Sequence, residues 1–214
     1  MNNDSPLGIF GGTFDPIHIG HIEPVIEAAK QVNIDKIALL PCHIPTHKGV
    51  SNTSSQHRLE MVKLTCQQYP LFYPDDRDIK RGIPTYSIDT LREFRQQFPT
   101  RPLCFFIGMD SLLSINSWYQ WQKLFELCHF VVCQRPNYDT DLSPEIVHLL
   151  QHRQVTDTRA LQQSLGGKIY LAKTKKITLS STTLRQYLRN NVPVDGLIPE
   201  SVINYIQQYK LYQD

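Results

Sequence analysis

The sequence has little net charge, no long apolar run and no closely paired cysteines, and each absence excludes a class of protein. It holds 22 Lys and Arg against 20 Asp and Glu in 214 residues, a formal net charge of +2. Proteins that neutralise many phosphates of nucleic acid usually carry a stronger basic excess, so we expect no nucleic-acid partner. The longest apolar runs, such as 103–109, are too short to cross a bilayer, so we expect no membrane partner.

The start of the chain, MNNDSPLGIF, has neither a basic segment nor a long apolar one. It does not resemble a signal peptide, and we expect a cytoplasmic protein. The five cysteines contain no C-x-x-C pair, and we expect reduced side chains that act as small hydrophobes, with Cys104, Cys128 and Cys133 in or beside apolar runs. A hydrophobic fraction of 41% allows a sizeable core, and we expect a single domain over 1–214 with a helical portion from about 181.

Short apolar runs alternate along the chain with longer segments of helical pattern. Runs of successive apolar residues, typical of strands buried on both faces, predict strands over 7–10, 36–41, 71–74, 102–108, 129–133 and 168–172. Helices are expected over 20–32, 55–69, 86–97, 118–127, 143–153, 181–190 and 199–210. This alternation predicts an α/β fold with a doubly wound, Rossmann-like, mostly parallel sheet and helices on both faces. Ligands bind such sheets beyond the carboxyl ends of the strands.

The stretch GGTFDPIHIGH, residues 11–21, follows the first predicted strand and holds two histidines. Proline is best tolerated in the first turn of a helix, so Pro24 predicts a helix that begins near Gly20 or His21. His18 and His21 then lie at a helix N-terminus, where free N–H groups and the helix dipole attract anions. The pattern indicates an anion site in which the imidazoles donate hydrogen bonds to phosphate oxygens.

Two glycines support that interpretation, and two alternatives remain. Gly11 and Gly12 allow the backbone to approach a phosphate closely. Zinc would need a third or fourth ligand, for which only His43 and His47 are candidates, and no acidic or thiol partner has the usual spacing. Imidazoles that only cap the loop are the other alternative. The stretch matches neither a Walker A loop nor G-x-G-x-x-G.

A second motif, LSSTTLR at 179–185, follows the last predicted strand and opens a predicted helix. Ser180, Ser181 and Thr182 are residue types that cap helix N-termini, and Arg185 lies about one turn beyond them. Hydroxyls, free N–H groups and a guanidinium can therefore converge on one cluster of phosphates. Taken alone, an ordinary capped helix with a surface arginine explains this segment as well.

Together the two stretches resemble the nucleotidylyltransferase superfamily, whose signatures are G-x-F-D-P-x-H-x-G-H and I-S-S-T-x-x-R. Within it, the chain is similar over nearly its whole length to bacterial nicotinate-nucleotide adenylyltransferases. The similarity runs through PCHIPTHK, GIPTYSIDTL, FIGMDSL, SWYQW and VVCQRP, at 41–48, 82–91, 106–112, 117–121 and 131–136. The resemblance implies an enzyme of NAD biosynthesis that transfers an adenylyl group from ATP to nicotinate mononucleotide. The products would be deamido-NAD and pyrophosphate, with no covalent enzyme intermediate.

The resemblance also implies roles for individual residues. Catalytic contacts to the phosphates fall on His18, His21 and Arg185. The implied ATP-binding residues are Gly11, Gly12, Thr13, Phe14, Gly108, Asp110, Ser181 and Thr182. Asp110 would contact the adenosine ribose, and it could also act as a helix N-cap. Mg²⁺ is the expected cofactor, held mainly by the ATP phosphates and water rather than by a protein metal site, because the sequence offers no carboxylate cage.

For nicotinate mononucleotide the implied contacts are His47, Lys48, Tyr86, Ser87, Trp118, Tyr119 and Arg135. Trp118 would stack on the pyridine ring, although an isolated tryptophan is more commonly a core residue. Backbone N–H groups near Tyr86, Ser87 and Tyr119 would bind the nicotinate carboxylate. The sequence departs from the family pattern outside the two signatures, at Cys42-His43 in place of Asn-Asn, at Lys48 in place of arginine and at Met109 in place of a polar residue.

Other functions stay open at this point. The same chemistry could act on nicotinamide mononucleotide, on phosphopantetheine or in cytidylyl transfer, and a non-catalytic nucleotide- or metal-binding module is a further alternative. Class I aminoacyl-tRNA synthetases share the first type of motif, but they carry a lysine-rich loop where this chain has LSSTTLR. The sequence leaves the oligomeric state open, a homo-oligomer included.

Overall fold

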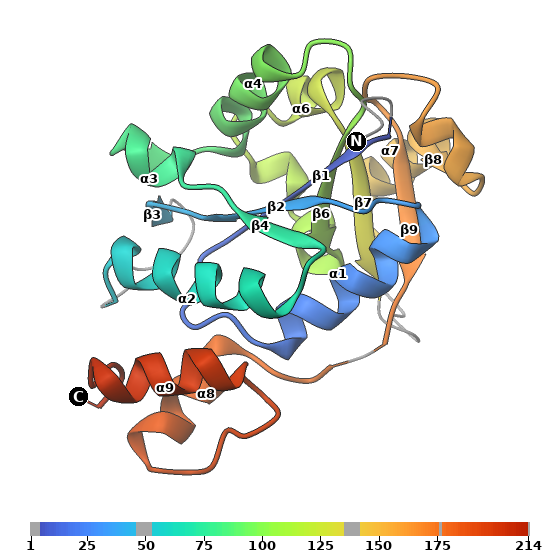
Figure 1. Ribbon diagram of the computed structural model, residues 1–214. Helices are drawn as coiled ribbons and strands as arrows, with labels where there is room; N and C mark the ends of the chain where they lie inside the picture. Colours follow the sequence, from blue (N-terminus) through green and yellow to red (C-terminus); the bar gives the residue numbers. More distant parts are fainter. Residues whose placement is uncertain (1–4, 46–52, 135–141, 176, 214) are drawn as a thin grey trace. The chain divides into compact units, whose positions relative to one another are not determined.

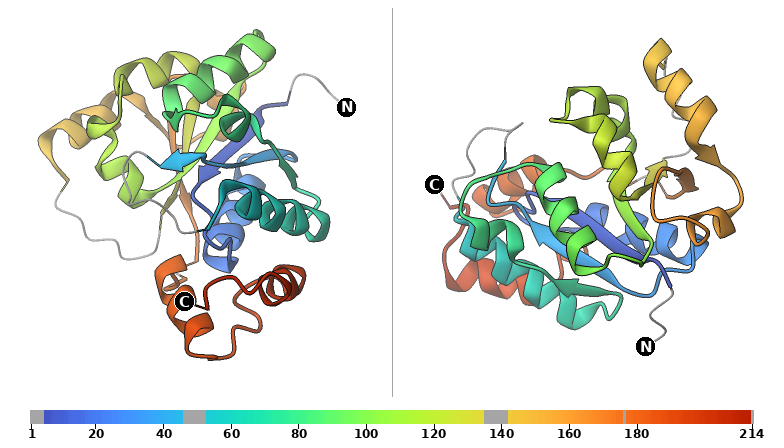
Figure 2. Two further views of the ribbon diagram at one scale, coloured as in Figure 1. Left: turned by 90° about the vertical axis from the view of Figure 1, so that its left-hand side faces the viewer. Right: turned by 90° about the horizontal axis from the view of Figure 1, so that it is seen from above.

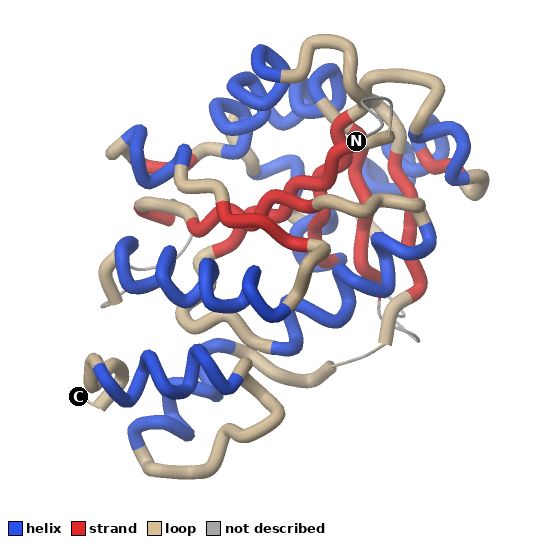
Figure 3. The backbone as a smooth tube through the Cα atoms, in the orientation of Figure 1, coloured by secondary structure: helices blue, strands red, loops and turns tan. Residues whose placement is uncertain are grey.

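The computed structural model describes residues 5–45, 53–134, 142–175 and 177–213, through which strands and helices alternate (Figures 1 and 3). His47, Lys48 and Arg135 lie outside these described residues. By its internal contacts the chain divides into two compact units. The first unit consists of Met1–Phe10, Val25–Ile37 and Tyr86–Lys176, and the second of Gly11–Pro24, Ala38–Thr85 and Ile177–Asp214. That the whole chain forms one domain stays a prediction.

The strands form a seven-stranded sheet in the order β4-β2-β1-β6-β7-β9-β8. Their bounds are Leu7–Gly12 (β1), Ile37–Pro41 (β2), Phe72–Pro74 (β4), Leu103–Gly108 (β6), His129–Gln134 (β7), Gln154–Val155 (β8) and Ile169–Lys173 (β9). β6 pairs in parallel with β1 and β7, and β9 pairs in parallel with β7 and β8. The strand order reverses between β1 and β6. β1 therefore lies at the topological switch point where sheets of this kind bind ligands.

The core of the first unit is built on strands whose successive residues are apolar. Leu103–Ile107 of β6 and Phe130–Val132 of β7 are all buried, as expected for strands covered on both faces. The rings of Phe125 and Phe130 lie 4.8 Å apart. Helices α4 (Ser87–Gln97) and α6 (Trp121–Leu127) pack side by side (Figure 2). The remaining helices are α5 (Met109–Leu113) and α7 (Pro144–Arg153), with 3₁₀ turns at Ile115–Ser117 and Thr158–Leu161.

The second unit contains the helices that carry both motifs or pack against them. They are the first turns of α1 (Ile19–Gln31), then α2 (Ser55–Gln68), α3 (Arg77–Arg81), α8 (Ser181–Arg189) and α9 (Glu200–Gln208). A two-stranded parallel sheet joins β3 (Ile44–Pro45) to β5 (Pro84–Thr85). Helix α9 lies against α2, where His57 Nδ1 and the Tyr205 hydroxyl are 2.9 Å apart.

The predicted strands are confirmed to within about two residues at each end, and so are all but one of the predicted helices. The exception is the helix predicted over 118–127, which begins only at Trp121, because Gln120 adopts a left-handed φ of 53° that breaks the helical path. Cys104 and Cys128 are buried in the core, as predicted, and burial raises the pKa of the Cys104 thiol to about 12. Within the described part of the chain, no helix has both the length and the apolar character needed to span a membrane.

Candidate active site

Helix α1 begins directly after His18, and its first N–H groups are bonded within the protein. The Ile19 N–H donates to the Leu197 carbonyl (3.0 Å) and the Gly20 N–H to His18 Nδ1 (3.1 Å). The N–H groups of His21 and Ile22 both donate to the His18 carbonyl. The prediction that the first N–H groups of this helix are free is therefore wrong, because these internal acceptors satisfy them.

Pro24 lies deeper in helix α1 than the sequence predicts. The helix begins at Ile19, one residue before the predicted start near Gly20 or His21, and Pro24 lies inside α1, beyond the first turn in which the sequence argument placed it. The external acceptor for the Ile19 N–H lies far along the chain, at Leu197. That long-range bond, which local sequence does not reveal, accounts for the early start of the helix.

His18 is a buried neutral imidazole, and one of its ring nitrogens has no hydrogen-bond partner among the described residues. Its side chain is 2% exposed, and burial lowers the pKa of His18 to about 4. Because Nδ1 accepts the Gly20 N–H, the proton of the neutral ring resides on Nε2. Nε2 has no hydrogen-bond partner among the described residues. A buried donor without a partner is costly, so this geometry suits an N–H group that completes its bonding when an anion binds.

His21 is held against His18 and Phe14. The two imidazole rings lie 3.8 Å apart, and the Phe14 ring meets His21 edge-on at 5.3 Å. Phe14 reaches this position through a left-handed backbone with φ of 49°. A Cβ at Gly12 would lie 2.8 Å from the Phe14 ring, so only glycine leaves room for it. The second glycine of the motif thus also serves to seat the aromatic ring beside His21.

The second motif opens helix α8 as the sequence predicts. Ser180 is the N-cap, and its hydroxyl accepts the Thr183 N–H at 3.1 Å. The Arg185 guanidinium follows one turn later, and its Nη2 donates to the Thr182 hydroxyl oxygen at 3.2 Å. That bond leaves the Thr182 hydroxyl hydrogen available to another acceptor.

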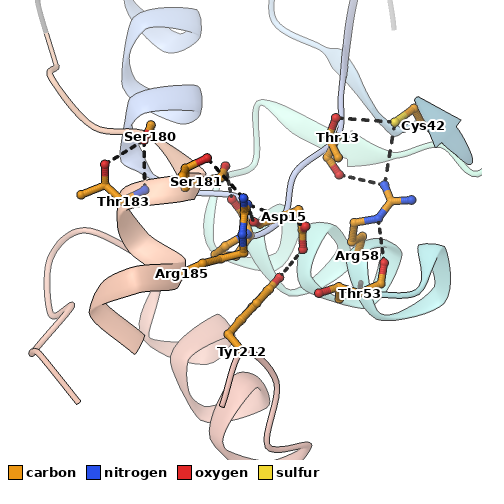
Figure 4. A network of polar contacts seen from close by, with 12 residues as sticks. Thr13, Asp15, Cys42, Thr53, Arg58, Ser180, Ser181, Thr183, Arg185 and Tyr212 are labelled. Carbon is orange, nitrogen blue, oxygen red and sulfur yellow. Dashed lines mark hydrogen bonds and ion pairs between the residues drawn. The ribbon is translucent and has the colours of Figure 1, made fainter. Parts of the chain in front are cut away.

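Both motifs meet in the second unit (Figure 4). Arg185 Nη1 donates to the Asp15 carbonyl at 2.8 Å, and it lies 3.8 Å from the Asp15 carboxylate. The Ser181 hydroxyl donates to the Pro16 carbonyl at 3.2 Å. These two bonds join residues that lie 165 and 170 positions apart in the sequence. The loop after β1 and the capped helix α8 are therefore in direct contact.

Sequence reasoning missed the buried guanidinium of Arg58, which is 1% exposed on α2. Its nitrogens donate to the carbonyls of Thr13 (2.8 Å) and Thr53 (3.4 Å), as Figure 4 shows, and to the carbonyl of His43 (2.8 Å). Arg58 thus ties the loop after β1 to the segment after β2 and to the start of α2. The only signal in the sequence is a lone arginine in a helix of mixed character, since its acceptors, which are three backbone carbonyls and the Cys42 Sγ (3.9 Å), all lie outside α2.

The residues assigned to the base and the sugar lie in the first unit. Gly108 caps helix α5 and is exposed, and Asp110 stands in the first turn of that helix. Asp110 is therefore not the N-cap, because the helix starts one residue before it, at Met109.

The residues assigned to the pyridine are also in the first unit. Ser87 is the first residue of α4, as expected, and the rings of Tyr86 and Tyr119 lie 5.2 Å apart with both side chains exposed. Trp118 is half-buried and edge-on to Phe105, with 6.3 Å between ring centroids. Trp118 thus packs on the core residue Phe105, whereas Tyr86 and Tyr119 face solvent.

The described residues contain no group of three or more His, Cys, Asp or Glu side chains that could hold a metal ion. His43 instead lies 3.2 Å from the Ser55 hydroxyl through its Nδ1 atom. His47, the other candidate zinc ligand, falls outside the described residues. The described part of the chain therefore gives the zinc alternative no support.

Comparison with known proteins identifies the class. The cytidylyltransferase-like family model matches residues 9–187, which include both motifs. The chain therefore belongs to the cytidylyltransferase-like family, whose members are nucleotidyltransferases.

Individual relatives within this family carry more specific names. A Pseudoalteromonas atlantica protein named as a probable nicotinate-nucleotide adenylyltransferase is 53% identical over 100% of this chain and 98% of its own. An Aeromonas salmonicida protein of the same name is 45% identical over 98% of both chains. Among solved structures, the Plasmodium falciparum nicotinic acid mononucleotide adenylyltransferase complexed with NaAD shares the fold, with a TM-score of 0.71, 22% identity and 97% coverage of both chains.

Proposed function

We propose that the protein transfers the adenylyl group of ATP to nicotinate mononucleotide, forming deamido-NAD and pyrophosphate in NAD biosynthesis. The observation that carries this proposal is the junction of the two motifs, in which Arg185 bonds Asp15 of the loop that leads to His18 and to His21 in the first turn of α1. Relatives with the adenylyltransferase name match essentially the whole chain, which supports the same acceptor.

The chemistry requires charge to be stabilised rather than a covalent intermediate. A phosphate oxygen of the mononucleotide forms a bond to the α-phosphorus of ATP, while the bond from that phosphorus to the bridging oxygen breaks and pyrophosphate leaves. Negative charge grows on the α-phosphoryl oxygens and on the leaving group. In our proposal, the Nε2–H of His18 and the imidazole of His21 donate to these oxygens.

The pyrophosphate is held by the residues that open α8. The Arg185 guanidinium, the hydroxyl of Thr182 and the first N–H groups of the helix share this role, with Ser181 beside them. Arg185 has further N–H groups beyond the pair bonded to Asp15 and Thr182. Gly11, Gly12, Thr13 and Phe14 would supply backbone contacts to the same phosphates.

The nicotinate carboxylate would be recognised by the start of α4. The first N–H groups of any helix lack an intrahelical acceptor, and at α4 they follow Tyr86 and begin with Ser87. An uncharged amide in place of the carboxylate would gain less from these donors and from the helix dipole. This difference supports an acid substrate over nicotinamide mononucleotide, with Trp118 and Tyr119 at the ring and Asp110 at the adenosine ribose.

We also propose Mg²⁺ as the cofactor, bound through the ATP phosphates and water. The described residues offer donors such as His18 Nε2 and Arg185 toward phosphate and no clustered carboxylates toward a metal. When bound, the ion would neutralise phosphate charge.

The variant His21→Ala tests the role of the imidazole. It should lower kcat by on the order of 10²-fold, because it removes a contact to charge that develops in the transition state. Dinucleotide and pyrophosphate formation would be measured with purified protein, and circular dichroism would confirm that the variant folds. His152→Ala, on the exposed face of α7, is the matched control and should retain full activity. A folded His21→Ala protein with near-normal kcat would exclude this role.

A further inference from the structure

The turn after α9 brings the phenol of Tyr212 to residues 13–18, the loop between β1 and α1 that we call the signature loop. After α9 the backbone adopts left-handed φ angles at Lys210 (51°) and Tyr212 (65°), a conformation unfavourable for residues with side chains. The turn is fixed by the N–H groups of Lys210 and Leu211, which donate to the carbonyls of Gln207 and Ile206. The unfavourable backbone persists because these bonds and the contacts of Tyr212 hold it.

The Tyr212 hydroxyl donates to Oδ1 of Asp15 at 2.7 Å (Figure 4). Asp15 is buried, 6% exposed, between Phe14 and Pro16 of the signature loop. Burial foremost, and then the charge of Asp15, raise the pKa of Tyr212, so the phenol keeps its proton and remains a donor. Thr53 makes a further hydrogen bond to the same side chain.

Asp15 also faces Arg185, which bonds its backbone carbonyl rather than its carboxylate. Tyr212 bonds Oδ1, while Arg185 Nη1 bonds the Asp15 carbonyl and stays 3.8 Å from Oδ2. Arginine and carboxylate prefer a closer, two-pronged pair when nothing else engages the oxygens. The phenol therefore keeps Asp15 from drawing the guanidinium into such a pair, which would turn its N–H groups away from a phosphate.

We propose that Tyr212 is a positioning residue for the phosphate site, acting through Asp15 to hold Arg185 free to bind the pyrophosphate portion of ATP. The inference rests on the proposed function of Arg185. It adds the C-terminal turn, which neither motif contains, to the parts of the chain on which that function depends.

Tyr212→Phe is the direct test, because it removes the hydroxyl and keeps the ring. Binding of inorganic pyrophosphate by calorimetry should weaken about tenfold, and kcat/KM for ATP should fall by a similar factor. KM for nicotinate mononucleotide should stay within twofold, because Arg185 does not serve the acceptor. Tyr209→Phe, which keeps a ring that packs against His57 and Tyr205 just before the same turn, is the matched control and should leave every value unchanged.

The double variant distinguishes a specific effect of Tyr212 on Arg185 through Asp15 from a general loss of structure in the C-terminal turn. In an Asp15→Asn background, the further change Tyr212→Phe should alter pyrophosphate binding by less than twofold, because the carboxylate that competes for Arg185 is gone. The proposal is overturned if Tyr212→Phe leaves pyrophosphate binding unchanged, weakens both substrates equally, or acts as strongly without Asp15. Pyrophosphate binding needs no acceptor, so failure of the adenylyl-transfer proposal alone would leave this result intact.

Discussion

At the scale of single residues, His18 links burial to chemistry. A histidine in water is partly protonated near neutral pH, and a protonated ring could not accept the Gly20 N–H at Nδ1. Burial lowers the pKa of His18 to about 4, so the ring stays neutral and presents Nε2–H as a donor. The environment thus selects one tautomer before any phosphate arrives.

This shift predicts how stability depends on pH. The unfolded chain takes up a proton on His18 below its ordinary value of 6.5, whereas the folded protein does so only near pH 4. The unfolding free energy contributed by this residue is therefore intact above pH 6.5 and falls by about 3 kcal/mol as the pH drops to 4. Urea unfolding of the wild type and of His18→Gln across this range gives the difference, in which other buried histidines such as His129 cancel. Parallel pH profiles for the two proteins would contradict the burial of a neutral ring.

Gly20 leaves room for the His18 imidazole because it has no side chain. A Cβ at this position would lie 3.0 Å from both Cε1 and Nδ1 of the imidazole and 3.4 Å from the Leu179 carbonyl. Alanine favours a helix over glycine by about 1 kcal/mol, which offsets part of the crowding. Gly20→Ala should therefore change the melting temperature by only a few degrees while lowering kcat about tenfold, since the ring must move. Thermal melts and steady-state kinetics on the same preparation test this, and an unchanged kcat would contradict it.

At the scale of secondary-structure elements, Arg58 joins parts of the chain that the sequence keeps separate. It donates to the carbonyls of Thr13, which follows β1, of His43, which follows β2, and of Thr53, which precedes α2. None of these groups belongs to a helix or sheet ladder that would otherwise satisfy it, so the guanidinium fixes the loop conformations directly.

Arg58→Met should lower the unfolding free energy by about 3 kcal/mol, because the carbonyls of Thr13, His43 and Thr53 all lose the N–H groups that this guanidinium donates to them. Denaturant unfolding measures the loss. Lys63→Met on the same helix is the matched control, since Lys63 forms only an exposed ion pair with Glu60 and its removal should cost less than about 0.5 kcal/mol. Equal effects of the two variants would show that the Arg58 contacts do not stabilise these loops.

The elements themselves were predictable where the signal is local. Runs such as IALLP and LCFFIG define strands by composition, and Ser180 marks the start of α8 by capping. The short elements β3, β5 and α3 were not predicted, since elements of such length carry no periodic pattern. Arg58 and Tyr212 were missed for a related reason, as their partners lie on distant segments and are set only by the tertiary fold.

At the scale of the whole molecule, the proposed roles divide between the two units. The second unit holds the phosphate-directed residues of both motifs, and the first holds the residues assigned to the pyridine and the ribose. In our proposal the motifs serve the transfer of the adenylyl group and do not themselves select the acceptor. In our proposal the acceptor is recognised by segments such as 86–87 and 118–119, whose short sequences are informative only through resemblance.

The central claim is the choice of acceptor, and a direct comparison of kcat/KM for nicotinate mononucleotide and nicotinamide mononucleotide, with saturating ATP and Mg²⁺, tests it most directly. We predict at least about a tenfold preference for the acid, because only a carboxylate gains from the charge and dipole at the start of α4. The products should be deamido-NAD and pyrophosphate in equal amounts. A preference for the amide, or no dinucleotide from either acceptor, would contradict the account.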